Sequence, residues 1–107
     1  MDREGYVYVP THCANGTNTQ IRCKLHVAFH GCGQSVEIVQ DAFYWHGGYN
    51  RWAEANNVVV PFPQVAMRDF NPEGCWDWWG YTGSEYLTRN GMQMRAVKGM
   101  IDRMLRN

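Results

Sequence analysis

The alternation of apolar and polar residues predicts three short β-strands. Tyr6–Pro10 alternates aromatic and β-branched residues and stops at a proline. Leu25–Phe29 is a short apolar run that one histidine interrupts, and Val58–Pro63 is the clearest buried strand, ended by its prolines. β-Branched and aromatic residues favour strands, and proline ends them. We expect the run at 25–29 to lie in the centre of the sheet.

Two further segments have helical spacing. Residues 49–56 predict a short amphipathic helix, and residues 91–105 predict a longer one whose apolar residues share a face. We expect this face, with its methionines, to be part of the core. Residues 36–45 have only some helical spacing, so their structure stays open.

The order strand, strand, helix, strand, helix is typical of an α/β sheet with crossover helices. At 107 residues the chain is one domain or a piece of one. Three strands make a small sheet, and an exposed strand edge favours aggregation. We therefore expect further strands to lie beside these.

The charge pattern gives no sign of a nucleic-acid or membrane partner. Ten basic and ten acidic residues cancel and are mixed along the chain. No apolar run approaches the roughly 20 residues of a transmembrane helix. The first residues lack the apolar core of a signal peptide. If the protein is secreted, its export signal is expected outside this sequence.

Four cysteines in so short a chain indicate an oxidising, extracellular compartment. None forms a Cys-x-x-Cys motif and no Cys/His pair has zinc-site spacing, so we expect no metal and no cofactor. Four cysteines allow three pairings. We favour Cys13 with Cys23, closing the loop between the first two strands, and Cys32 with Cys75. Free structural thiols remain the alternative.

Two motifs suggest half of an ester-hydrolysing site. The run at 25–29 leads directly into His30-Gly31-Cys32-Gly33-Gln34, and a buried strand ending in His-Gly often begins an oxyanion loop. The second motif is Gly-Cys-Trp-Asp-Trp-Trp-Gly-Tyr at 74–81, within a long aromatic loop at 69–86. The two serines, Ser35 and Ser84, do not lie in a Gly-x-Ser-x-Gly motif. We expect the chain to be inactive by itself.

The aromatic loop and the His-Gly loop offer several candidate side chains. Period-two alternation would turn Trp76 and Trp78 inward and let Trp79 and Tyr81 line a crevice for an apolar substrate. For Asp77, between the tryptophans, we expect a solvated or capping role. His30 has no nucleophile in evident reach, so we expect it to shape its loop.

Three stretches, at 25–34, 48–57 and 71–83, resemble the poly(3-hydroxybutyrate) depolymerases. These are secreted serine esterases of α/β-hydrolase fold. The resemblance implies a partial α/β-hydrolase-like sheet of about three strands, with crossover helices and a long Trp-rich loop, and residues 1–107 would form a single segment of the catalytic domain. It is nearest to the circularly permuted branch, in which this segment is C-terminal and lacks the nucleophile. In the unpermuted order, the helix at 91–105 would instead lead into the nucleophile strand.

The resemblance also implies roles for individual residues and a function. The backbone N–H of Cys32 would be one of two oxyanion donors, and Trp79 would border the substrate crevice. The expected function is a segment of an extracellular depolymerase that hydrolyses poly(3-hydroxybutyrate). Its expected partners are a polyhydroxyalkanoate polymer or oligomer and the remainder of the hydrolase domain. The alternatives are a non-catalytic polymer-binding remnant and part of a feruloyl or acetylxylan esterase.

Overall fold

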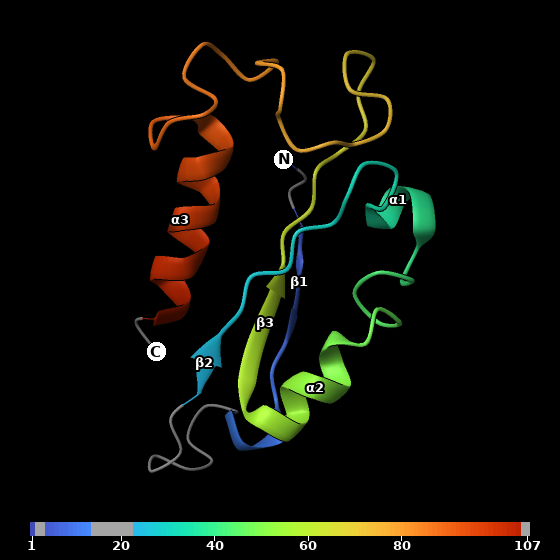
Figure 1. The fold of residues 1–107 in the computed structure, drawn as a ribbon, viewed down its shortest axis with the longest axis vertical. Helices are drawn as coiled ribbons and strands as arrows, with labels where there is room; N and C mark the ends of the chain where they lie inside the picture. Colours follow the sequence, from blue (N-terminus) through green and yellow to red (C-terminus); the bar gives the residue numbers. More distant parts are fainter. Residues whose placement is uncertain (2–3, 14–22, 106–107) are drawn as a thin grey trace.

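The computed structural model describes residues 1, 4–13 and 23–105, and within them it contains a small α/β fold (Figure 1). Three strands form one sheet in the order β1-β3-β2. The strands are β1 (Tyr6–Tyr8), β2 (Lys24–Leu25) and β3 (Val58–Phe62). The helices are a 3₁₀ turn, η1 (Thr11–Cys13), and α1 (Val36–Val39), α2 (Tyr49–Asn56) and α3 (Met92–Leu105). The α/β class predicted from the order of elements is confirmed.

The central strand of the sheet is β3, not the segment at 25–29, so that prediction is wrong. β1 pairs with β3 antiparallel and β2 pairs with it parallel. Beyond β2 the ladder continues, because the N–H groups of His26 and Ala28 donate to the carbonyls of Val59 and Pro61 at 2.9 and 3.0 Å. Four of the five residues of β3 are buried, whereas His26 and Phe29 are exposed. Burial on both faces is what selects β3 as the centre.

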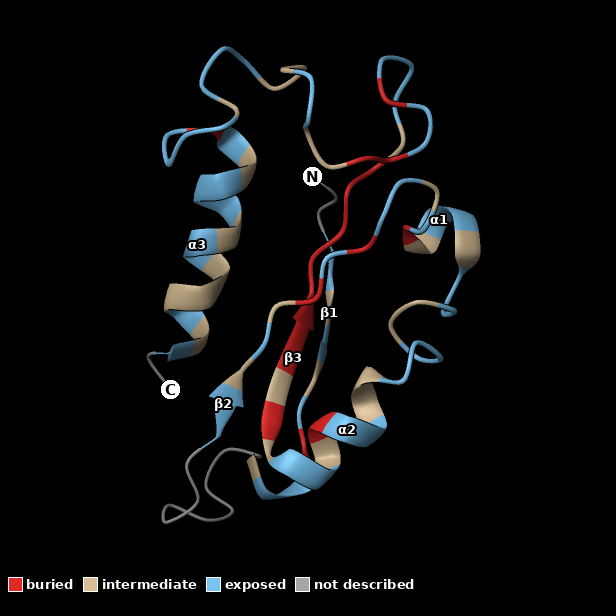
Figure 2. Cartoon of the chain, viewed as in Figure 1, coloured by how far each residue is buried: buried red, intermediate tan, exposed pale blue. Residues whose placement is uncertain are grey.

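The core lies where α2 packs against β3. Its fully buried members are small or branched side chains around one phenylalanine, namely Ala28, Ala53, Val58, Val60 and Phe62. Tyrosine and phenylalanine rings from β1, the segment before α2 and α2 itself surround Phe62, mostly edge-on. Figure 2 shows that burial follows β3 and continues into the segment after it. The bounds predicted for α2, Tyr49–Asn56, are confirmed.

The long helix α3 forms as predicted, within one residue, but its apolar face does not join the core. No residue of α3 is buried, and Met94 is 51% exposed. The expectation that its methionines lie in the core is therefore wrong. The described sheet ends at β2, so α3 has no further strand to cover in this part of the structure. Residues 36–45, left open above, form only the four-residue α1 followed by turns.

The structure contains both disulfides favoured from the sequence. Cys13 is bonded to Cys23 with a Cα–Cα distance of 5.9 Å, and Cys32 to Cys75 with a distance of 4.3 Å. The first joins the end of η1 to the residue before β2. The second joins the loop after β2 to the aromatic loop, across a sequence separation of 43 residues. The Cys32–Cys75 disulfide closes the longer loop and therefore restricts the unfolded chain more than the Cys13–Cys23 disulfide does.

This difference gives a stability prediction. Replacing Cys32 and Cys75 together by alanine is expected to lower the free energy of unfolding by about 4 kcal/mol, because the bond closes a long loop. Replacing Cys13 and Cys23, whose separation is 10 residues, is expected to cost about 3 kcal/mol. Urea unfolding followed by circular dichroism measures both. A smaller loss for the Cys32/Cys75 pair would contradict this ranking.

Candidate functional site

The loop after β2 is shaped by a buried histidine. His30 is 2% exposed. Its Nε2 lies 3.2 Å from the backbone N of Val65 and must accept that hydrogen bond, so Nδ1 carries the proton and donates to the carbonyl of Gly31 at 2.8 Å. Both ring nitrogens are thus used within the protein. This agrees with the structural role expected for His30.

The N–H groups on both sides of Cys32 in this loop are paired within the protein. The N–H of Gly31 donates to Gln34 Oε1 at 2.7 Å, that of Gly33 to the carbonyl of Glu73 at 2.7 Å, and that of Gln34 to the carbonyl of Gly31 at 3.2 Å. The N–H of Cys32 has no acceptor among the described residues, and Cys32 is exposed. A fixed, exposed and unpaired N–H can bind an oxygen that carries negative charge.

A buried asparagine connects this loop to the aromatic loop. Asn71 is 1% exposed. Its Nδ2 donates to the carbonyl of Cys75 and its Oδ1 accepts from the N–H of the same residue, both at 2.9 Å. Since Cys75 is also bonded to Cys32, Asn71 fixes the Cys75 end of the disulfide. Asn71 was not predicted to be a site residue; the signal that could have found it is the turn-forming Asn-Pro-Glu-Gly at 71–74.

The motif at 74–81, which contains three tryptophans, is folded around the carboxylate of Asp77. Oδ1 accepts from the N–H groups of Trp79 (3.1 Å), Gly80 (2.5 Å) and Tyr81 (3.1 Å). Oδ2 accepts from the N–H and the hydroxyl of Thr82, at 2.8 and 2.5 Å. This is a capping role, one of the two expected. Desolvation acts to raise the pKa of Asp77, but the hydrogen bonds from Thr82, Gly80 and Trp79 outweigh it and hold the pKa below its ordinary value.

Three aromatic rings from the turn around Asp77 and the ring of Phe70 form one row on the surface. Ring centroids are 5.1 Å apart for Trp78–Trp79, 4.8 Å for Trp79–Tyr81 and 5.6 Å for Tyr81–Phe70. Phe70 is 62%, Trp78 69% and Trp79 42% exposed. We call these four residues the aromatic row. The Tyr81 hydroxyl donates to the carbonyl of Cys75 at 2.7 Å and accepts from Gln93 Nε2 at 2.6 Å. These two hydrogen bonds fix the position of the Tyr81 ring within the row.

The prediction that Trp78 turns inward is wrong. Strict alternation requires an extended strand, and the hydrogen bonds to Asp77 bend the chain at 79–82 instead. Trp76 is half-buried, with its ring 5.1 Å from that of Phe29 and 5.7 Å from that of His30. It therefore packs beside the His-Gly loop, while the other two tryptophans face outward.

The described part of the chain contains neither a candidate metal site nor a membrane-spanning helix. No group of three or more His, Cys, Asp or Glu residues there could hold a metal ion. None of its helices is long and apolar enough to cross a membrane.

The fold and this geometry define a segment of an α/β protein in which a loop with the exposed, unpaired N–H of Cys32 is joined by a disulfide to the loop that bears the aromatic row. Comparison with known proteins identifies the relatives of this segment. The chain is 47% identical to a poly(3-hydroxybutyrate) depolymerase of Delftia acidovorans over 105 residues, which are 97% of this chain and 20% of the relative. It is 40% identical to a polyhydroxybutyrate depolymerase of Talaromyces funiculosus over 117 residues, covering 98% of this chain and 33% of the relative. No protein-family model matches the chain.

Solved structures agree with these relatives. The crystal structure of a PHB depolymerase from Penicillium funiculosum superposes with a TM-score of 0.83 at 42% identity, over 92% of this chain and 34% of that one. A PHB depolymerase complexed with an R3HB trimer gives a TM-score of 0.79 at 40% identity, with the same coverage. Nearly the whole chain is therefore homologous to a segment of the PHB depolymerases, which confirms the family predicted from the sequence. The chain spans between a fifth and about a third of the length of these relatives.

The lowered pKa of Asp77 predicts a pH-dependent contribution to stability. Because the folded pKa lies below the unfolded value of about 3.9, the carboxylate stabilises the protein above that pH, and the stabilisation is lost as the pH falls through the folded pKa. At pH 7, Asp77→Asn is expected to lower the free energy of unfolding by about 1–3 kcal/mol, since hydrogen bonds to a charged group are lost. The difference from wild type should shrink below about pH 4.

Urea unfolding at several pH values, followed by tryptophan fluorescence, measures this difference. Asp69→Asn is the matched control, because Asp69 is exposed and lies in the same loop. An equal loss in both variants, or a loss for Asp77→Asn that does not change with pH, would contradict the role of the carboxylate.

Proposed function

We propose that this chain forms part of the active site of an extracellular depolymerase that hydrolyses the ester bonds of poly(3-hydroxybutyrate). The observation that carries the proposal is the unpaired backbone N–H of Cys32. The N–H groups of Gly31 and Gly33 on either side are paired, and the side chain of Cys32 is disulfide-bonded. The similarity to PHB depolymerases over nearly the whole chain supports it. No cofactor is needed for this chemistry.

In this proposal the Cys32 N–H stabilises the charge that develops during ester hydrolysis. A serine on the remainder of the hydrolase domain attacks the ester carbonyl, and the carbonyl oxygen becomes an oxyanion that accepts the hydrogen bond. Collapse of this intermediate releases the alcohol end of the polymer and leaves an acyl-enzyme, which water hydrolyses to release the hydroxy acid. The Cys32 side chain takes no part, because its sulfur is bonded to Cys75.

The aromatic row would be the wall against which the polyester lies. Poly(3-hydroxybutyrate) carries methyl groups and ester groups but no charge, so apolar contact suits it. Trp79 and Tyr81 are the residues for which we propose this contact, because Trp79 is exposed and Tyr81 is anchored beside it. A PHB depolymerase of similar structure has been solved with an R3HB trimer, which supports a hydroxybutyrate oligomer as the ligand.

Secretion is part of the same proposal. Two disulfides in a 107-residue chain fit a protein that folds in an oxidising compartment. An insoluble polymer outside the cell would be its substrate.

The exposed aromatic row also favours one alternative, a non-catalytic module that binds the polymer. It predicts that the chain adsorbs to poly(3-hydroxybutyrate) granules without releasing hydroxybutyrate, and that serine-directed inhibitors change nothing. A feruloyl or acetylxylan esterase is less supported, since the relatives and structures described above are PHB depolymerases. Activity on aryl esters of sugars and none on polyester would favour it.

The oxyanion role is tested in a chimera that carries this chain in place of the matched region of the Talaromyces funiculosus relative. The chimera is expected to release 3-hydroxybutyrate from the R3HB trimer. Gly33 has φ +72 and follows Cys32, so Gly33→Val strains the peptide that bears the loop. This variant is expected to lower kcat about 10²–10³-fold, as the loss of one oxyanion donor does.

Gly48→Val is the matched control for this experiment. Gly48 has φ +91, and a Cβ added there, as at Gly33, meets no atom within 4 Å, but it lies at the start of α2. It is expected to reduce stability while kcat stays near that of the parent chimera. Equal loss of kcat in both variants would contradict the role of the Cys32 loop, and a folded but inactive parent chimera would contradict the enzymatic proposal.

The substrate wall is tested by Trp79→Ala in the same chimera. Loss of one aromatic contact is expected to raise KM for the R3HB trimer about five- to tenfold, with kcat nearly unchanged. Trp45→Ala removes an equally large exposed ring, 59% exposed and outside the aromatic row, and is expected to leave KM as it is. Initial rates over a range of trimer concentrations give both constants. An unchanged KM in Trp79→Ala would remove this residue from the wall.

A further inference from the structure

We propose that Gln34 is a positioning residue of the candidate active site, whose side chain closes onto Gly31 and orients the N–H of Cys32 toward the ester oxygen. The inference rests on the proposed function, in which this N–H binds the oxyanion. Gln34 is exposed, so its side chain is not needed to fill the core. Its hydrogen bonds to Gly31 indicate what it does instead.

Gln34 binds both peptide groups that flank the Cα of Gly31. Its Oε1 accepts from the N–H of Gly31 at 2.7 Å, and its own N–H donates to the carbonyl of Gly31 at 3.2 Å. His30 Nδ1 donates to the same carbonyl at 2.8 Å. Holding both peptide planes fixes the two backbone dihedral angles of Gly31, which as a glycine has the widest choice of conformations.

The direction of the Cys32 N–H follows from the carbonyl of Gly31. The two groups belong to one peptide unit, which is trans and planar, so they point in opposite directions. The carbonyl is turned toward His30 and Gln34, and the N–H therefore points away from both. A donor whose direction is fixed before the reaction needs no reorganisation when the oxyanion forms.

The lack of a side chain at Gly31 makes room for the Gln34 amide. A Cβ on Gly31 would lie 2.9 Å from Gln34 Oε1, 3.3 Å from its Cδ and 3.9 Å from its Nε2, and these would be its three nearest atoms. Gly31 does not have a positive φ, so its backbone conformation does not by itself require glycine. Contact with the Gln34 side chain is therefore the reason that the structure shows for a glycine here.

The orientation of the Gln34 amide follows from its partner. The N–H of Gly31 needs an acceptor, so Oε1 faces Gly31 and Nε2 is the more distant end. Glutamine thus accepts this hydrogen bond without bringing a negative charge beside the oxyanion. A glutamate could accept it too, but its charge would oppose the developing charge of the substrate.

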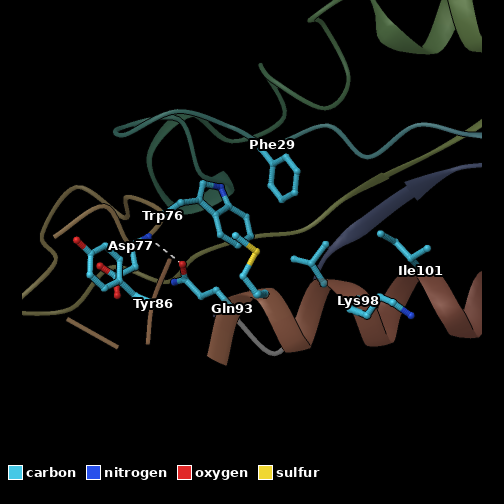
Figure 3. Close-up of a pocket in the computed structure, with 9 residues that line it drawn as sticks. Phe29, Trp76, Asp77, Tyr86, Gln93, Lys98 and Ile101 are labelled. Atoms are coloured by element: carbon cyan, nitrogen blue, oxygen red, sulfur yellow. Dashed lines mark hydrogen bonds between the residues drawn. The ribbon is translucent and has the colours of Figure 1, made fainter. Parts of the chain in front are cut away.

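The other contacts of His30 do not involve Gln34. Nε2 of His30 accepts from the N–H of Val65, and the ring of Trp76 lies 5.7 Å from its ring. Figure 3 shows Trp76 and Phe29 at the wall of a cavity of about 480 Å³, and Gln34 does not line this cavity. Substitution of Gln34 therefore removes its side-chain hydrogen bond and leaves the packing around His30 in place.

The test uses the chimera with the Talaromyces funiculosus relative. Gln34→Met keeps the length of the side chain but removes the acceptor of the Gly31 N–H. The kcat for the R3HB trimer is expected to fall about five- to tenfold, as the loss of one hydrogen bond gives, with KM nearly unchanged. The melting temperature is expected to stay near that of the parent, since Gln34 is exposed. A merely structural role would lower the melting temperature and leave kcat of the folded enzyme unchanged.

Gln40→Met is the matched control. Gln40 follows α1, is exposed, and undergoes the same chemical change. It is expected to keep the kcat of the parent chimera. Equal loss in both variants, or an unchanged kcat in Gln34→Met, would overturn the proposal.

Gly31→Ala tests the same contact from the other side. The added Cβ would displace the Gln34 amide without straining the backbone, and kcat is again expected to fall about five- to tenfold. The double variant Gly31→Ala/Gln34→Met is expected to lose no more than either single variant, because both remove the same contact. Additive losses would contradict the proposal.

Hydrogen exchange measures the contact without using activity. With isotope labelling of the glycines in the chimera, the Gly31 amide is expected to exchange about tenfold faster in Gln34→Met than in the parent, and at the parent rate in Gln40→Met. An unchanged rate in Gln34→Met would overturn the proposal. A parent chimera with a protected Gly31 amide that hydrolyses no R3HB trimer would count against the proposed function and not against this contact.

Discussion

The Cys32–Cys75 disulfide is the constraint on which the candidate site depends. It joins two loops that are 43 residues apart in sequence, one with the unpaired N–H and one with the aromatic row. Besides the disulfide, the hydrogen bond from the N–H of Gly33 to the carbonyl of Glu73 joins the two loops, and loops of this length usually have several conformations unless such links fix them. The disulfide also removes the thiol, so the feature of Cys32 on which the proposed function rests is its exposed backbone N–H.

Two polar side chains fix the backbone of the aromatic loop next to the disulfide. Asn71 holds the backbone of Cys75 from both sides, and Asp77, two residues further on, accepts from four successive backbone N–H groups. The carboxylate thus does for these amides what a helix or strand would do, because it accepts hydrogen bonds from N–H groups that would otherwise be unpaired in a loop. Exposed tryptophans can be held rigidly only if their backbone is fixed in such a way. The local polar network is therefore what allows an apolar surface to remain exposed and ordered.

Much of the fold could be predicted from the sequence, and the failures have common causes. The helix at Tyr49–Asn56 was predictable because periodicity is a local signal. The disulfides were predicted from the segments that each pairing would join, because four cysteines alone allow three pairings. The central strand was assigned wrongly because the run at 25–29 and β3 are both apolar, and only tertiary burial distinguishes them. Trp78 was placed inward because alternation assumes a strand, and the acceptor capacity of Asp77 overrides it. The unpaired N–H of Cys32 depends on what its neighbours bond to, which no residue pattern reveals.

The exposed face of α3 and the open edge of β2 have the same physical origin. The apolar face of α3 was expected in the core on the basis of its periodicity, and that expectation assumes a full sheet beneath the helix. Within the described residues the sheet stops at β2, so the helix faces a cavity instead. The open edge of β2 leads into the loop with the free N–H. The exposed N–H of Cys32 therefore follows, along the chain, an edge of the sheet that has no partner among the described residues.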